Sequence, residues 1–152
     1  MQLRSRYPSP RRRTTELRPA SSGRHVLVRI LVADDSVAVR RCLCGFLDRH
    51  DGWHVCDEVS NGREAVERFQ QVRPDVIVLD FQMPEMNGLE AARLIVGLSP
   101  KTPILMVTTY PSKQLSDEAK KVGIRGACAK TDINSIVDAV GALLREETYF
   151  PN

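Results

Sequence analysis

The sequence predicts an α/β fold in which a parallel sheet is covered by helices on both faces, and three observations support this. Short apolar runs alternate with amphipathic segments from residue 26 onward. One of these runs, Val76 to Leu79, is continuously apolar, which is typical of a strand buried on both faces. Acidic side chains directly follow two of the runs. Repeated strand–helix units of this kind imply parallel strands joined by crossover helices.

The first half of the chain is expected to contain three strands and two helices. The strands are 26–33, 53–56 and 76–79. Ser36 is suited to cap the first helix, whose apolar positions share one face. Asn61-Gly62 closes the second strand, and the second helix stops at Pro74 because proline cannot continue a helix. The apolar residues expected to share a face are Val39, Leu43, Phe46 and Leu47 in the first helix, and Ala65, Val66, Phe69 and Val72 in the second.

The second half repeats the alternation of strands and helices, but its helices differ in how extensive their apolar faces are. A loop at 83–88 leads into a helix with Leu89, Ala92 and Ile95-Val96, and strands are expected at 104–107 and 124–129. The helix between these two strands, about 112–122, has a thin apolar face, so we expect it to be weakly anchored. The last helix has a strong stripe of apolar residues, namely Ile133, Ile136, Val137, Val140, Leu143 and Leu144.

The length and composition of the chain limit the classes of protein to which it can belong. A chain of 152 residues is long enough for one well-cored domain and too short for two ordinary ones. No stretch approaches the roughly 20 apolar residues that span a bilayer, so we expect no membrane partner and a cytoplasmic location. The four cysteines form no C-x-x-C pair and have no zinc-like spacing. They are interpreted as buried or incidental thiols, as is usual in the cytosol.

Charge is unevenly distributed along the chain. Residues 1–25 contain seven arginines against one acid, so they carry +6, and the remainder carries −3 because the whole chain carries +3. This segment is rich in Arg, Ser and Pro and lacks apolar periodicity, which predicts a disordered N-terminal extension. No apolar segment follows Arg11-Arg12-Arg13, so an export signal is not expected. An arm that binds nucleic acid is a disfavoured alternative.

The expected strand ends bring a set of polar side chains to one edge of the sheet. Asp34-Asp35, Asp80, Thr108 and Lys130 each follow or end an expected strand. Because parallel strands present their carboxyl ends at the same edge, these groups should meet there. Clustered carboxylates repel one another, and Mg²⁺ would relieve this, since it prefers carboxylate, phosphate and water oxygens. An Asp can also act as a nucleophile and hold a phosphoryl group, with Lys130 and Thr108 as its charge and hydrogen-bond partners.

On these residues the chain resembles the receiver domain of two-component response regulators. The resemblance rests on Asp34-Asp35, the segment 80–88 (DFQMPEMNG), Thr108 and Lys130, and it covers about residues 26–147. It implies a stand-alone receiver in style closest to the NarL/FixJ-type subfamily. The implied fold is flavodoxin-like and doubly wound, with five parallel strands in the order 2-1-3-4-5. Residues 148–152 would form a C-terminal tail.

The resemblance also implies roles and partners. Asp80 is similar to the phosphoacceptor, and Asp34, Asp35, Asp80 and the backbone carbonyl of Gln82 are similar to the Mg²⁺ ligands. Thr108 is similar to the switch hydroxyl, and Lys130 to the lysine that pairs with the phosphoryl group. The expected donor is a phosphohistidine on a sensor histidine kinase or a histidine phosphotransfer protein, and the output is a switched protein-interaction surface. Such a domain is a phosphoacceptor that assists its own chemistry, not a metabolic enzyme.

The chain departs from the family in three places, one of which is Thr109-Tyr110 after the switch Thr, where small residues are common, and alternatives remain open. Many receivers carry an aromatic residue three positions before the lysine, where this chain has Ala127, and many have Lys-Pro where it has Lys130-Thr131. One alternative is an interaction module with a receiver fold that is not phosphorylated. Another is a DNA-binding transcriptional regulator that lacks its output domain, although nucleic acid is not the expected partner. A phosphatase with an Asp nucleophile usually has a second Asp two residues later; this chain has Gln82, which disfavours that class.

Overall fold

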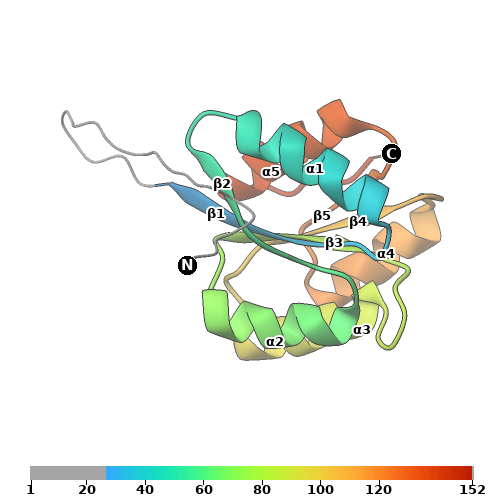
Figure 1. Ribbon diagram of the computed structural model, residues 1–152. Helices are drawn as coiled ribbons and strands as arrows, with labels where there is room; N and C mark the ends of the chain where they lie inside the picture. The colour runs from blue at the N-terminus through green and yellow to red at the C-terminus, as the bar shows by residue number, and fades with distance from the viewer. Residues whose placement is uncertain (1–26, 152) are drawn as a thin grey trace.

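The computed structural model describes residues 27–151, in which strands and helices alternate along the chain (Figure 1). The strands are β1 (Val28–Ala33), β2 (Trp53–Val59), β3 (Val76–Asp80), β4 (Ile104–Thr108) and β5 (Gly126–Ala129). The helices are α1 (Val37–Arg49), α2 (Gly62–Val72), α3 (Gly88–Leu98), α4 (Lys113–Val122) and α5 (Ile133–Leu144). The fold is therefore the α/β arrangement that the sequence predicts.

All strand pairs of this sheet are parallel, and the strand order is β2-β1-β3-β4-β5. This confirms the flavodoxin-like order expected from the family resemblance. The order reverses at β1, from which the chain passes first to β2 on one side and later to β3 on the other. Open α/β sheets bind ligands beyond the carboxyl ends of the strands at such a switch point. The register pairs Ala33 with Leu79, so the residues that follow β1 and end β3 are neighbours.

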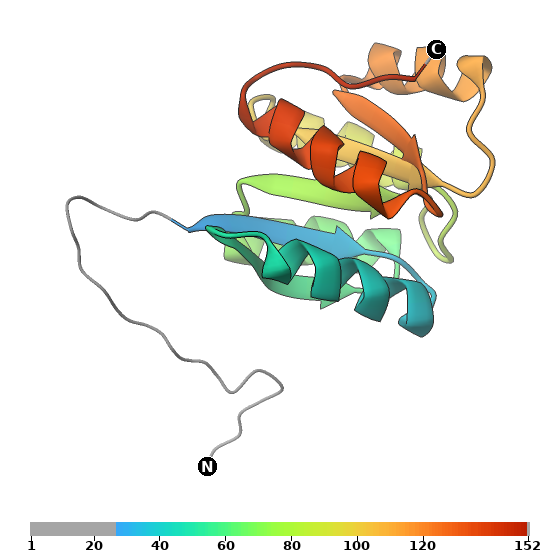
Figure 2. The same ribbon diagram turned by 90° about the horizontal axis from the view of Figure 1, so that it is seen from above.

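Helices cover both faces of the sheet. Helices α1 and α5 lie on one face, and α2 and α3 lie on the other (Figures 1 and 2). Successive strand residues alternate between the two faces, so β1 sends Ile30 and Val32 into one hydrophobic cluster and Leu31 and Ala33 into the other. Helix α4 contributes only one fully buried apolar residue, Ala119, to the cluster it shares with α2 and α3. This agrees with the thin apolar face that the sequence shows for that helix.

Three local expectations are wrong. The second strand does not stop at Cys56 but continues through Val59. Asp57 and Glu58 belong to this strand, and each pairs with an arginine from a helix: Asp57 with Arg68 of α2, and Glu58 with Arg40 of α1 on the opposite face. Phe46 does not share the buried face of α1; it is 41% exposed, and Cys44 is buried in its place. The fifth strand is also shorter than expected, since it begins at Gly126 instead of residue 124.

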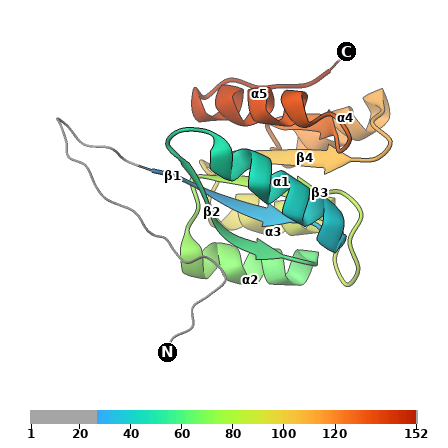
Figure 3. The ribbon, with the colours of Figure 1, turned by 45° about the horizontal axis from the view of Figure 1, so that its top comes forward.

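The chain folds back after α5. Glu146, a non-glycine residue with a left-handed φ of 64°, reverses the chain direction. Residues 148–151, here called the C-terminal strap, then run along the outer side of β5 (Figures 2 and 3). The N–H of Tyr149 donates to the carbonyl of Arg125 at 2.9 Å, and the N–H of Ala127 donates to the carbonyl of Tyr149 at 2.9 Å. The ring of Phe150 packs against the core, with the Lys120 ammonium 4.8 Å from its centroid.

The expected Arg-rich extension, residues 1–25, lies outside the described residues, as do Val26 and Asn152. Within residues 27–151, no helix has the length and apolar character needed to cross a membrane.

Candidate functional site

Asp80 ends β3 and is 1% exposed. One carboxylate oxygen, Oδ1, accepts the backbone N–H of Gln82 at 3.3 Å. The other, Oδ2, accepts a hydrogen bond from the ammonium of Lys130 at 3.0 Å. The loop that follows is folded tightly against this residue, because a Cβ on Gly88 would overlap the Asp80 carbonyl. Glycine at position 88 therefore allows α3 to begin directly beside the site.

The acidic pair follows β1. Asp34 is fully buried, and its Oδ1 accepts the N–H of Ser36 at 2.8 Å at the start of α1. Its Oδ2 lies 3.1 Å from the Lys130 ammonium but makes no hydrogen bond to any described residue. Asp35 is exposed. Asp34, Asp35 and Asp80 each present one carboxylate oxygen, and these three atoms lie within 4.8 Å of one another.

Lys130 and Thr108 come from the ends of β5 and β4. The backbone N–H of Lys130 donates to the carbonyl of Thr108 at 2.8 Å, which fixes the two residues side by side. Thr108 is 5% exposed, and its hydroxyl oxygen accepts the N–H of Tyr110 at 3.2 Å. The structure thus brings the three acids close together, with Lys130 in contact with Asp34 and Asp80, and places Thr108 at the same edge of the sheet. Gln82 lies two residues after Asp80, and its backbone N–H donates to the Asp80 carboxylate.

The electrostatics of the site are dominated by burial of negative charge. Burial raises the pKa of Asp80 to about 6, and Asp34 adds to the rise, while the hydrogen bond from Lys130 opposes it. Burial alone would lower the pKa of Lys130, but its hydrogen bond to Asp80 and its ion pair with Asp34 outweigh this, and the pKa of Lys130 is raised. Lys130 is therefore held in the charged form, while Asp80 carries a negative charge that the site does not fully compensate.

The donor atoms fit a hard divalent cation. Mg²⁺ is bound in proteins by one or two carboxylates together with phosphate and water oxygens, and all the donors here are carboxylate oxygens. The buried Asp34 Oδ2 without a hydrogen bond is the kind of atom that a cation would satisfy. A single ammonium shared by two buried carboxylates leaves a net negative charge, which a cation would also offset.

One contact near the site was not predicted from the sequence. Arg40, in the N-terminal half of α1, donates to the backbone carbonyl of Asp34 at 2.8 Å and to Glu58 of β2 at 2.8 Å. A positive side chain near a helix N-terminus is electrostatically unfavourable, which is a signal that it has a specific partner. The partner itself is not predictable from the sequence, because the strand expected at 53–56 leaves Glu58 outside the sheet.

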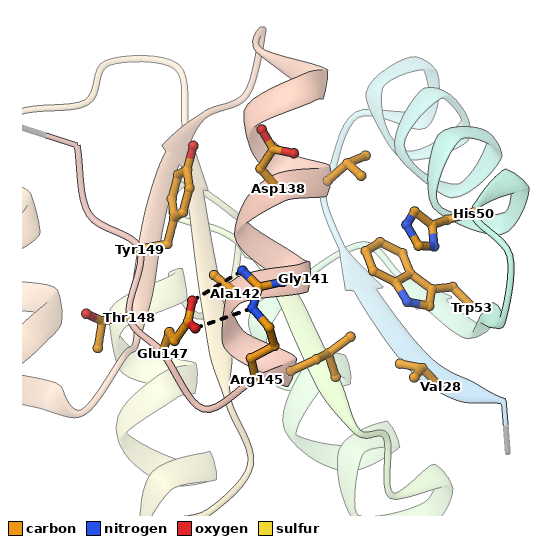
Figure 4. A pocket seen from close by; sticks show the side chains of 12 residues that line it. Val28, His50, Trp53, Asp138, Gly141, Ala142, Arg145, Glu147, Thr148 and Tyr149 are labelled. Atoms are coloured by element: carbon orange, nitrogen blue, oxygen red, sulfur yellow. Dashed lines mark hydrogen bonds and ion pairs between the residues drawn. The ribbon is translucent and has the colours of Figure 1, made fainter.

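A separate groove of about 730 Å³ lies at the opposite end of the sheet (Figure 4). It is lined in part by Val28 and Trp53, at the amino ends of β1 and β2, and by the last turns of α5. The His50 and Trp53 rings stack there at 3.7 Å, and Arg145 pairs with Glu147 on the other wall. The acids follow the carboxyl ends of the strands, so this groove is distinct from the candidate site.

Comparisons with known proteins agree with the geometry. The response regulator receiver domain model matches residues 30–141. The chain is 33% identical over 102 residues to chemotaxis protein CheY of Thermotoga maritima, which covers 67% of this chain and 84% of that protein. It is 41% identical over 123 residues to a protein-glutamate methylesterase/protein-glutamine glutaminase of Alkalilimnicola ehrlichii, which covers 78% of this chain. The chain spans only 31% of the length of that relative.

Solved structures give the same result. The chain is similar to a crystal structure of a two-component response regulator of the LuxR family from an Aurantimonas species, with a TM-score of 0.78 and 27% sequence identity. The match covers 81% of this chain and 89% of that structure. The sheet order, the helices on its two faces and the family match over residues 30–141 lead to one conclusion. The chain belongs to the response regulator receiver domain family.

Proposed function

We propose that this domain is a phosphorylatable switch of a two-component or phosphorelay system, and that Asp80 is its phosphoacceptor. The observation that carries the proposal is the environment of Asp80. This carboxylate is almost fully buried, lies 3.0 Å from the Lys130 ammonium, and has two further acids close enough to share a cation with it. A surface acid with a structural role would need neither the buried ammonium nor the acidic pair.

The proposed donor is a phosphohistidine on a sensor histidine kinase or a histidine phosphotransfer protein. A carboxylate oxygen of Asp80 attacks the phosphorus, and an O–P bond forms as the P–N bond to the donor imidazole breaks. The electron pair of the broken bond goes to the imidazole nitrogen, which takes up a proton. Asp80 then holds the group as an acyl phosphate.

The other residues compensate charge and orient the phosphoryl group. Asp34, Asp35, Asp80 and the backbone carbonyl of Gln82 would hold Mg²⁺, which supplies positive charge to the phosphoryl oxygens. Lys130 supplies a second positive charge, and Thr108 a hydroxyl donor from the end of β4. The output would be an altered protein-interaction surface in a cytoplasmic regulator. The thin apolar contact of α4 supports this, because weakly packed elements change position most readily.

The test is intact-mass measurement after incubation with a small-molecule acyl phosphate and Mg²⁺. Wild type should gain one phosphoryl group, and neither the Asp80→Ala variant nor wild type with a chelator should gain it. A known receiver treated in parallel controls for the reagent. No addition to wild type, under conditions that modify the control receiver, would overturn the switch and favour a module that binds partners without phosphorylation.

A further inference from the structure

Arg40 connects three elements beside the acidic site. It lies in α1, its Nη1 donates to the backbone carbonyl of Asp34 at 2.8 Å, and its Nε donates to Glu58 Oε1 at 2.8 Å. The first of these partners follows β1, and the second lies near the carboxyl end of β2. The Arg40 and Glu58 side chains are only 16% and 19% exposed, so this ion pair is largely shielded from solvent.

The carbonyl that Arg40 holds has a direct influence on the site. It belongs to the planar peptide that joins Asp34 to Asp35, so its direction constrains the backbone from which both carboxylates extend. The other groups of Asp34 are held on different sides: its N–H donates to the carbonyl of Val59 at 3.1 Å, and its Oδ1 accepts from Ser36. Arg40 holds the remaining backbone group, the one next to Asp35.

The position of Arg40 is unfavourable unless it has these partners. The first turn of α1 contains no acid, and a positive charge near a helix N-terminus opposes the helix dipole. A guanidinium can hold two acceptors in fixed directions, which an ammonium does less well. Here one acceptor is a carboxylate of β2, and the other is the carbonyl between the two acids.

We infer that Arg40 is a positioning residue for the divalent-cation site, held in place by Glu58. It acts through the Asp34–Asp35 peptide, which it fixes so that both carboxylates face the ion that Asp80 shares. The inference rests on the proposed function, since it assumes that these acids bind a cation. Groups that orient metal ligands typically change metal affinity about 10- to 100-fold when they are removed.

The chain contains a second ion pair between a helix and β2, which serves as a matched control for a purely structural role of such a pair. Arg68 of α2 pairs with Asp57, the residue before Glu58 in β2. Because successive strand residues point to opposite faces, this pair lies across the sheet from Arg40 and Glu58. Arg68 also contacts Gln71, a residue of its own helix. Removing either arginine breaks an ion pair between a helix and β2, but only Arg40 bonds the peptide between the acids.

The experiment measures Mg²⁺ dissociation constants by isothermal titration calorimetry, together with thermal unfolding in chelator and in Mg²⁺. Arg40→Ala should bind Mg²⁺ about 10-fold or more weakly than wild type, and should lose much of the rise in melting temperature that Mg²⁺ gives. Arg40→Lys should be intermediate. Arg68→Ala should lower the melting temperature in chelator but bind Mg²⁺ as wild type does.

Equal Mg²⁺ affinity in wild type and Arg40→Ala overturns the positioning role and leaves the proposed function intact. If Arg40→Ala and Arg68→Ala weaken Mg²⁺ binding equally, the positioning role is also overturned. The loss of any ion pair between a helix and β2 would then be enough to lower the Mg²⁺ affinity. If wild type itself binds no Mg²⁺, the cation site fails and the inference fails with it. Arg40→Lys and Glu58→Gln, which retain hydrogen-bonding groups, decide the matter if Arg40→Ala does not fold.

Discussion

Replacing Asp80 with asparagine should make the folded domain more stable at neutral pH when no divalent cation is present. Asparagine keeps the shape of the side chain and removes its charge. The charge is costly because burial raises the pKa of Asp80 from its ordinary 3.8 to about 6, and the Asp34 carboxylate adds to the rise. Lys130 keeps an ionic partner in the variant, since its ammonium also lies 3.1 Å from Asp34.

The size and sign of the effect follow from proton linkage. Between the unfolded pKa of 3.8 and the folded pKa of about 6, the folded state binds more protons, so stability falls as pH rises. The destabilisation is absent below that range and complete above it. A difference of roughly 2.2 pKa units, at 1.36 kcal/mol per unit, corresponds to at most about 3 kcal/mol. Asp80→Asn should therefore gain up to that amount near neutral pH and progressively less as the solution is acidified.

The assay is urea unfolding of both proteins in chelator, followed by circular dichroism at several pH values from about 4 to 8. Glu67→Gln, which removes an exposed acid on α2, controls for the change in net charge. Added Mg²⁺ should raise the free energy of unfolding of wild type more than that of Asp80→Asn. A variant no more stable than wild type near neutral pH would refute the reasoning, and so would a gain that does not diminish in acid.

Three further variants test the loop, a comparison position in α1, and the strap. Gly88→Ala should destabilise the domain by about 1–3 kcal/mol and slow phosphorylation, because its methyl group would overlap the backbone of Asp80. Gly45→Ala, in α1 with no atom within 4 Å of the added methyl, should instead stabilise it by about 0.5–1 kcal/mol. Phe150→Ala should weaken the strap and speed hydrogen exchange of the Ala127 amide, whose acceptor lies in the strap; unchanged exchange there would show that the ring is dispensable.

The strand ends that carry the site were predictable because they follow continuous apolar runs. Asp80 and Lys130 are 50 residues apart, yet their contact follows from a parallel sheet that presents all its carboxyl ends at one edge. The helix caps were predictable because they depend on neighbouring residues. The side chain of Ser36 accepts a hydrogen bond from the Val39 N–H, as expected of a residue that caps the start of a helix. Predicting these features requires only the periodicity and composition of the sequence and the handedness of connections between parallel strands.

What the sequence did not predict depends on contacts between distant elements. The continuation of β2 through Asp57 and Glu58 depends on Arg68 and Arg40, which come from helices on opposite faces. The expected strand at 53–56 is therefore shorter than β2, which runs from Trp53 to Val59. Pairing of Tyr149 with β5 was also not predicted, because a single extended residue has no periodic pattern.

The two outer strands of the sheet discourage pairing with a foreign strand in different ways. Exposed strand edges are templates for aggregation, and proteins protect them with charge, short length or a covering segment. β2 carries Asp57 and Glu58, so a strand approaching this edge meets charged side chains. β5 is four residues long and is already paired with the chain's own Tyr149, while Pro151 offers no N–H with which to extend the ladder. A partner at the β5 side would therefore meet side chains of the strap, including the Phe150 ring, and not a bare row of backbone groups.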